Sequence, residues 1–159
     1  MFDARIPLLS LALAGGLTAA AEAADIVGPA QVIDANTVTI GSDVIRLADI
    51  DAPDLGQACE RAARRYDCGQ EAAWALAQRV ERHWLTCHGR ERDESGRVPA
   101  ICFLAGPAID INGHMVRQGW ALAVGERYAA EQAAAQRERR GLWAGRFAAP
   151  AEWRTRLRP

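Results

Sequence analysis

The stretches VIDANTVTI at residues 32–40 and IRLADIDAPD at 45–54 decide the fold of this chain. β-Branched and apolar residues alternate there with polar ones, and turn-forming residues interrupt the pattern at 34–36 and 41–43. Such alternation is typical of short strands with one buried face, and Gly, Asn and Asp favour the turns between them. The pattern predicts three antiparallel strands between residues 26 and 50.

The rest of the chain predicts further strands and helices. Two more strands are expected, at 85–88 and 98–104. Apolar residues recur with helical spacing in three segments, and glycine follows the last two, so helices are expected at 70–84, 112–118 and 128–140. Five strands with inserted and appended helices predict a small OB-fold-like β-barrel with about three α-helices, an α+β architecture.

Residues 1–23 are typical of a secretory signal peptide. Arg5 precedes an apolar segment at 6–20, and Ala21-Glu22-Ala23 has the small-x-small pattern of a cleavage site. The apolar segment is shorter than the roughly 20 residues of a membrane-spanning helix. The sequence therefore predicts cleavage near Ala23, a periplasmic or secreted protein without a stable membrane anchor, and one mature domain at 24–159.

Charge gives little support to strong non-specific nucleic-acid binding. The chain has 19 basic and 20 acidic residues, and removal of the signal takes away Arg5, Asp3 and Glu22, which leaves 18 of each. Such binding usually depends on an excess of basic charge. Arginines do gather near the C-terminus, where few acidic residues oppose them: positions 137, 139, 140, 146, 154, 156 and 158. Solvated helix surfaces are an equally good explanation for that cluster.

Four cysteines in a chain with a predicted signal peptide indicate disulfides. Sequence alone allows three connectivities. Cys59 and Cys68 flank a short polar loop, whereas Cys87 and Cys102 lie in two expected strands joined by a turn. We therefore predict the pairs Cys59–Cys68 and Cys87–Cys102. A zinc site is the alternative, although the spacings lack a C-x₂-C pair.

Arginine and oxygen-bearing side chains stand close together in the 45–54 stretch. Arg46 is followed by three aspartates, and Arg97 follows a polar turn at 93–96. Oxygen ligands suit Ca²⁺, and a planar guanidinium can bind phosphate through two parallel hydrogen bonds. The alternative is an ordinary ion-pair network between these arginines and Asp49, Asp51 or Glu94.

With these motifs the chain resembles the staphylococcal nuclease (thermonuclease) family. The resemblance runs from about residue 27 to 153 and rests on the order and spacing of several motifs: IRL and IDAPD within 45–54, SGR at 95–97, MVRQGWA at 115–121, Tyr128, and GLW at 141–143. It implies an OB-fold barrel, nucleic acid as the partner, and Ca²⁺-dependent hydrolysis of phosphodiester bonds in DNA or RNA.

The resemblance also implies roles for single residues. Asp51 corresponds to a metal-binding aspartate, and the carbonyl of Ala52 to a backbone ligand. Arg46 and Arg97 correspond to two phosphate-binding arginines. Two positions differ in type: a second metal-binding aspartate is Asn36, and the glutamate that orients or deprotonates the attacking water is Asp54.

These differences predict a weakened site. Asn36 offers oxygen without charge, so Ca²⁺ is expected to bind weakly. Asp54 is one methylene shorter than glutamate, which withdraws its carboxylate by roughly 1.5 Å. A misplacement of about 1 Å can cost on the order of a hundredfold in rate. Ala35 stands where the family has glycine, so we also expect strain in a turn that needs a positive φ.

Three hypotheses follow. The first is an exported, weakened thermonuclease in which Arg46, Asp54 and Arg97 are catalytic and Asn36, Asp51 and Ala52 hold the metal ion. The second is a non-catalytic barrel that binds nucleic acid or another anionic envelope ligand. The third is an accessory domain that no longer meets nucleic acid, which the two arginines disfavour.

Overall fold

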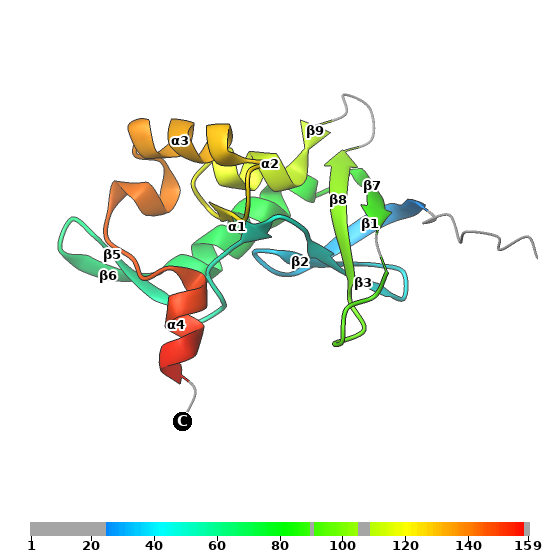
Figure 1. Cartoon of the computed structure of the whole chain (residues 1–159), viewed down its shortest axis with the longest axis horizontal. Helices are drawn as coiled ribbons and strands as arrows, with labels where there is room; N and C mark the ends of the chain where they lie inside the picture. The colour runs from blue at the N-terminus through cyan, green and yellow to red at the C-terminus, as the bar shows by residue number, and fades with distance from the viewer. Residues whose placement is uncertain (1–24, 90, 105–108, 158–159) are drawn as a thin grey trace, which may run out of the picture.

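The computed structural model describes residues 25–89, 91–104 and 109–157, which form a β-barrel with helices packed around it (Figure 1). The predicted signal peptide at 1–23 lies outside the described residues. Within those residues, no helix combines the length and the apolar character that crossing a bilayer requires.

Five strands form the closed wall of the barrel. They follow the order β3-β2-β1-β7-β8, and β3 also pairs with β8. The bounds are β1 Asp25–Asp34, β2 Thr37–Ile40, β3 Asp43–Leu47, β7 Trp84–Gly89 and β8 Val98–Leu104. Neighbouring strands are antiparallel except at the closing pair, where β3 and β8 run parallel with Ile45 opposite Val98. The prediction of a five-stranded OB-like barrel is confirmed.

Four α-helices and several short strands complete the described chain. The helices are α1 Cys68–Val80, α2 Ile111–Arg117, α3 Ala129–Arg137 and α4 Pro150–Leu157, with one 3₁₀ turn, η1, at Gly141–Ala144. The short strands are β4 Ile50–Asp51, β5 Ala58–Arg61, β6 Arg64–Asp67, β9 Ile109–Asp110 and β10 Leu122–Ala123. Sequence reasoning predicted α1, α2 and α3, but it missed α4 and the β5–β6 hairpin.

The first helix is shorter than predicted. It buries Ala72, Leu76 and Val80 in the main core, as its apolar spacing indicated. It stops at Val80 because Glu81 leaves the helical conformation, with ψ of 131°, and Arg82 then takes a positive φ of 63°. Trp84, expected on the last turn of the helix, instead begins β7 and is 58% exposed.

One buried amide joins α2 to the barrel wall. Asn112 is fully buried, and its side-chain nitrogen donates to the carbonyls of Ala48 (2.8 Å) and Ala100 (3.0 Å). Its side-chain oxygen accepts from the backbone nitrogen of Cys102 (3.2 Å). The end of β3, the middle of β8 and the start of α2 are thereby fixed to one another, which holds the strands that carry the candidate site.

Both predicted disulfides are present. Cys87 and Cys102 are directly opposite each other on β7 and β8. Cys59 on β5 bonds to Cys68 at the start of α1 and so ties the β5–β6 hairpin to that helix. Two disulfides fit a protein that works in an oxidising, extracytoplasmic compartment.

Candidate functional site

Two arginines lie at the closing β3–β8 pair of the barrel wall. Arg46 lies on β3, and Arg97 comes directly before β8, one residue ahead of the Ile45–Val98 pair. Ile45 and Val98 are buried, so the alternation of side chains directs both arginines away from the core. Arg46 is half-buried, and its side chain has no hydrogen bond or ion pair to any described residue. It is therefore available to an external anion.

The hairpin between β7 and β8 orients Arg97. Its Nε donates to Asp93 Oδ2 (3.0 Å), while Asp93 Oδ1 accepts from the backbone nitrogens of Ser95 (2.9 Å) and Arg97 (3.0 Å). Desolvation acts to raise the pKa of Asp93, but these hydrogen bonds and the Arg97 charge outweigh it, so the pKa is lowered. The terminal nitrogens of Arg97 have no partner among the described residues.

The candidate carboxylates are held by an arginine from the other end of the chain. Asp51 ends β4, and Asp54 follows three residues later. Arg154 on α4 places Nη2 2.8 Å from both oxygens of Asp51 and Nη1 at 3.2 and 3.4 Å from the oxygens of Asp54. Partial burial alone lowers the pKa of Arg154, but the hydrogen bonds and charges of the two aspartates prevail and raise it. The Arg154 guanidinium therefore keeps its positive charge beside the two aspartates.

Close backbone packing positions the Asp54 loop. The Asp54 carbonyl accepts from Gln57 N (2.9 Å), and a Cβ on Gly69 would lie only 1.9 Å from that carbonyl oxygen. Only glycine fits at the start of α1 against this loop. The buried Gln57 also donates from Nε2 to the carbonyl of Ala148 (2.9 Å). One residue thus links the Asp54 loop to the segment that leads into α4.

Asn36 lies beside β3, in the turn between β1 and β2. Its carbonyl accepts from Leu47 N (2.7 Å), its backbone nitrogen donates to Asp34 Oδ1 (2.9 Å), and its Oδ1 accepts from Thr37 Oγ1 (3.1 Å). Ala35 is buried in the core and has no positive φ. The expected strain at Ala35 was therefore wrong, because this turn is formed without the left-handed backbone.

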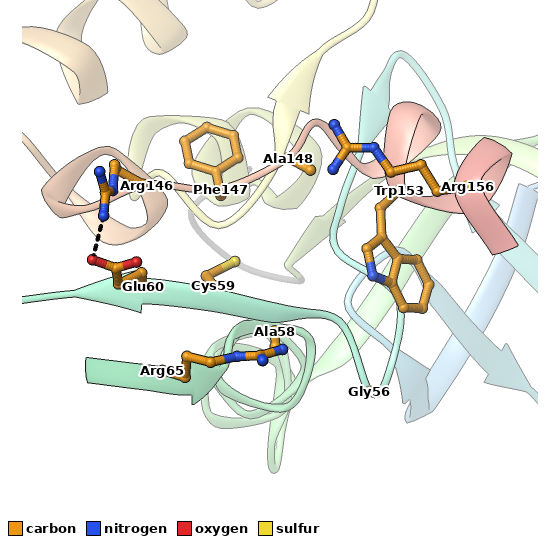
Figure 2. Close-up of a pocket in the computed structure, with 10 residues that line it drawn as sticks. All are labelled: Gly56, Ala58, Cys59, Glu60, Arg65, Arg146, Phe147, Ala148, Trp153 and Arg156. Carbon is orange, nitrogen blue, oxygen red and sulfur yellow. Dashed lines mark hydrogen bonds and ion pairs between the residues drawn. The ribbon is translucent and has the colours of Figure 1, made fainter. Parts of the chain in front are cut away.

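A groove of about 560 Å³ lies next to α4, between β5 and the segment at 146–156 (Figure 2). Glu60 and Arg146 join its two walls through backbone hydrogen bonds in both directions (2.9 and 2.8 Å) and through a side-chain ion pair at 2.7 Å. Trp153 and Arg156 extend from α4 along the other end of the groove. The segment before α4 is thus firmly attached to the disulfide-bonded hairpin.

Comparison with known proteins agrees with this architecture. Residues 44–145 match the family described as staphylococcal nuclease homologue. This chain belongs to that family. It is also 35% identical over 131 residues to the succinoglycan biosynthesis protein ExoI of Rhizobium meliloti (strain 1021), an alignment that covers 78% of this chain and 68% of that protein. The resemblance seen in the sequence is confirmed, and α4 lies beyond the segment that matches the staphylococcal nuclease homologues.

Calcium, which the nuclease family implies, does not fit the donor set in this arrangement. Arg154 engages all four carboxylate oxygens of Asp51 and Asp54, and the Asn36 side-chain oxygen already accepts a hydrogen bond. Among the described His, Cys, Asp and Glu side chains, no group of three or more could hold a metal ion. We therefore derive no reaction step through calcium, and the ligand roles of Asn36, Asp51 and the Ala52 carbonyl stay predictions.

Sequence reasoning missed the residue that dominates the carboxylate pair. The arginine cluster near the C-terminus was the available signal, because it holds more positive charge than its own acidic neighbours neutralise. Several of these arginines pair with acidic residues, some close in the sequence and some distant: Arg140 with Glu138, Arg156 with Glu152, Arg146 with Glu60, and Arg154 with Asp51 and Asp54. The spacing between positions 54 and 154 gives no hint of the last contact.

Proposed function

We propose that this member of the staphylococcal nuclease homologues binds phosphodiester chains, with nucleic acid as the favoured ligand, and that it does so without a divalent ion. Arg46 and Arg97 are the binding residues. The observation that carries the proposal is their placement at the β3–β8 pair, Arg46 on β3 and Arg97 directly before β8, both directed away from the core and both with guanidinium nitrogens free of partners among the described residues. Such nitrogens can form charge-assisted hydrogen bonds to phosphate oxygens.

The charge balance of Asp51 and Asp54 supports binding without metal. Two bare aspartates would repel a phosphate, and a divalent ion would normally have to offset that repulsion. Here Arg154 contributes one positive charge to Asp51 and Asp54, so the three side chains together carry one negative charge instead of two. The remaining charge is offset by Arg46 and Arg97, and a phosphate can approach the wall.

Calcium-dependent cleavage is the second candidate. It is favoured by the family, and by the presence of Arg46, Arg97, Asp51 and Asp54 in one chain. Because Arg154 occupies both carboxylates and Asn36 lacks a charge, we expect Ca²⁺ to bind weakly and any cleavage to be slow. We also propose export to the periplasm or beyond, which the two disulfides support.

Anisotropy of a fluorescent single-stranded oligonucleotide tests the binding function. Each of Arg46→Ala and Arg97→Ala should weaken binding by about tenfold, as for the loss of one charged hydrogen bond. Two phosphate contacts predict a slope near −1.4 for log K against log salt, and each single variant should reduce it to about −0.7. Arg137→Ala, an exposed change at the end of α3, is the matched control and should leave both quantities unchanged.

Chelator and competitor separate the alternatives. The affinity should be the same in EDTA and in Ca²⁺, and nucleotide release in Ca²⁺ should be slow in the same samples. Because the relative is named for succinoglycan biosynthesis, polygalacturonate, a carboxylated polysaccharide, serves as the competitor. If polygalacturonate displaces the oligonucleotide at a lower concentration than unlabelled DNA does, an anionic polysaccharide is the better ligand. Equal affinities of wild type and the Arg46/Arg97 double variant would refute the proposal.

A further inference from the structure

We propose that Arg154 is a built-in substitute for a divalent cation: its guanidinium takes the place between Asp51 and Asp54 that a metal ion would need, and its removal creates a metal-binding site. This inference depends only on the carboxylate pair and α4. It therefore stands or falls separately from nucleic-acid binding.

The contacts of Arg154 resemble the coordination of a hard cation more than an ordinary surface ion pair. One guanidinium contacts four oxygens of two carboxylates that lie 103 and 100 residues away in the sequence. Proteins hold Ca²⁺ and Mg²⁺ in a similar way, with carboxylate oxygens from different residues around one cation at about 2.0–2.6 Å. The nitrogen–oxygen distances here are 2.8–3.4 Å, so a metal ion in place of the guanidinium has to draw the carboxylate oxygens closer.

Guanidinium and metal ion exclude each other at this place. Asp51 has no free oxygen while Nη2 contacts both of its carboxylate oxygens. The Asp51 side chain is only 13% exposed, so an incoming ion has little open surface from which to reach it beside Arg154. A metal ion can therefore bind only when Arg154 has moved away or has been replaced.

The structure allows Arg154 to be replaced without loss of the fold. Within α4 only Pro150 is buried, and Leu157 is 62% exposed, so the helix adds little to the core. The chain just before α4 is attached independently, through the Glu60–Arg146 backbone pair and the Gln57–Ala148 hydrogen bond. Substitution of Arg154 should thus loosen one short helix on a fixed anchor.

Metal titration of the full-length mature protein tests the proposal. The probes are Ca²⁺, followed by calorimetry, and Tb³⁺, whose luminescence a nearby tryptophan such as Trp153 can sensitise. Wild type should bind Ca²⁺ only in the millimolar range, and Arg154→Met should bind at least about tenfold more tightly. Arg156→Met is the matched control and should behave as wild type. It removes a guanidinium from the same helix, but that guanidinium pairs with Glu152 and not with Asp51 or Asp54.

Two further variants make each outcome decisive. Adding Asp51→Asn to Arg154→Met should abolish the gained binding, because one carboxylate then remains. Arg154→Lys keeps the charge and the helix but cannot reach both carboxylates with two nitrogens, so it should show an intermediate affinity. Near-UV circular dichroism verifies that the variants are folded. Equal Ca²⁺ affinity of wild type and Arg154→Met, or a gain that persists with Asp51→Asn, would overturn the inference.

Discussion

The four contacts between Arg154 and the two aspartates should provide most of the free energy that docks α4. Opposite charges about 4 Å apart interact by about 4 kcal/mol at an effective dielectric constant of 20. Desolvation and loss of side-chain freedom offset much of this, and Arg154 is 37% exposed. Replacement of Arg154 by methionine should therefore lower the opening free energy of α4 by about 2 kcal/mol, between the values typical of exposed and buried pairs.

Hydrogen exchange of one amide measures this directly. Trp153 N donates to the carbonyl of Ala149 at 2.9 Å in the first turn of α4, so its exchange reports opening of the helix. A loss of about 2 kcal/mol corresponds to roughly 30-fold faster exchange in Arg154→Met. Asp51→Asn should have a larger effect than Asp54→Asn, because Asp51 has the shorter contacts and the less exposed side chain.

The control and the refuting result concern the same amide. Arg156→Met removes an exposed pair within the helix and should cost less than about 0.5 kcal/mol. If the Trp153 amide exchanges at the same rate in wild type and Arg154→Met, then α4 is held by Trp153 and Pro150 packing, and the ion pairs contribute nothing measurable.

Further predictions concern stability, metal selectivity and pH. Asn112→Leu leaves the Ala48 and Ala100 carbonyls and the Cys102 amide without their partner and should lower the free energy of unfolding in urea by about 3–5 kcal/mol; a loss below about 1 kcal/mol would contradict this. Replacing Cys59 and Cys68 by serine should cost about 3 kcal/mol in the same assay, and a neutral result would show that the β5–β6 hairpin is not coupled to unfolding. Asn36→Asp in the Arg154→Met background should tighten Ca²⁺ binding by about a further tenfold in calorimetry, and no change would place Asn36 outside the site. The pKa of Asp93 is lower in the folded protein than the value of about 3.9 that it has in the unfolded chain. The ionised Asp93 carboxylate therefore orders the Arg97 loop fully above the unfolded pKa, and this contribution is lost as the pH falls through the folded pKa. The Arg97 Nε–H resonance should thus stay protected from pH 7 down to about 5, and its disappearance within that range would refute the assignment.

The barrel could be predicted from sequence because its signals are local. Alternation between residues 26 and 50 and turn residues at 34–36 and 41–43 specify β1, β2 and β3, and their register follows from which face is apolar. Gly119, with φ of 75°, follows the last residues of α2 in the left-handed conformation that is common at helix ends. Gly141, with φ of 51°, is also left-handed and is the first residue of η1. The helix boundary at Val80 was missed because the chain leaves the helical conformation at Glu81, a residue type that favours helices, and turns at Arg82, which has no intrinsic preference for a positive φ.

The candidate site was only half predictable for a different reason. Arg46, Arg97, Asp51 and Asp54 stand in motifs, so their identities were visible in the sequence. The partner of the two aspartates was not, because the Arg154 contact spans about a hundred residues and depends on where a short helix docks. The Gln57–Ala148 hydrogen bond and the three bonds of Asn112 are likewise tertiary, and nothing in a single sequence distinguishes a buried amide from an exposed one.

Closure of the barrel by β3 and β8 determines when in folding the proposed phosphate-binding wall exists. Arg46 follows Ile45 and Arg97 precedes Val98, so the parallel pairing of Ile45 with Val98 brings both arginines to one region of the wall from segments about fifty residues apart. Pairing of such distant segments is slow, since the entropy of the intervening loop is lost before the contacts form. The β1–β2–β3 meander can therefore form early while the ligand-binding wall forms late. A ligand that contacts both arginines recognises only chains whose barrel has closed, and its binding reports complete folding.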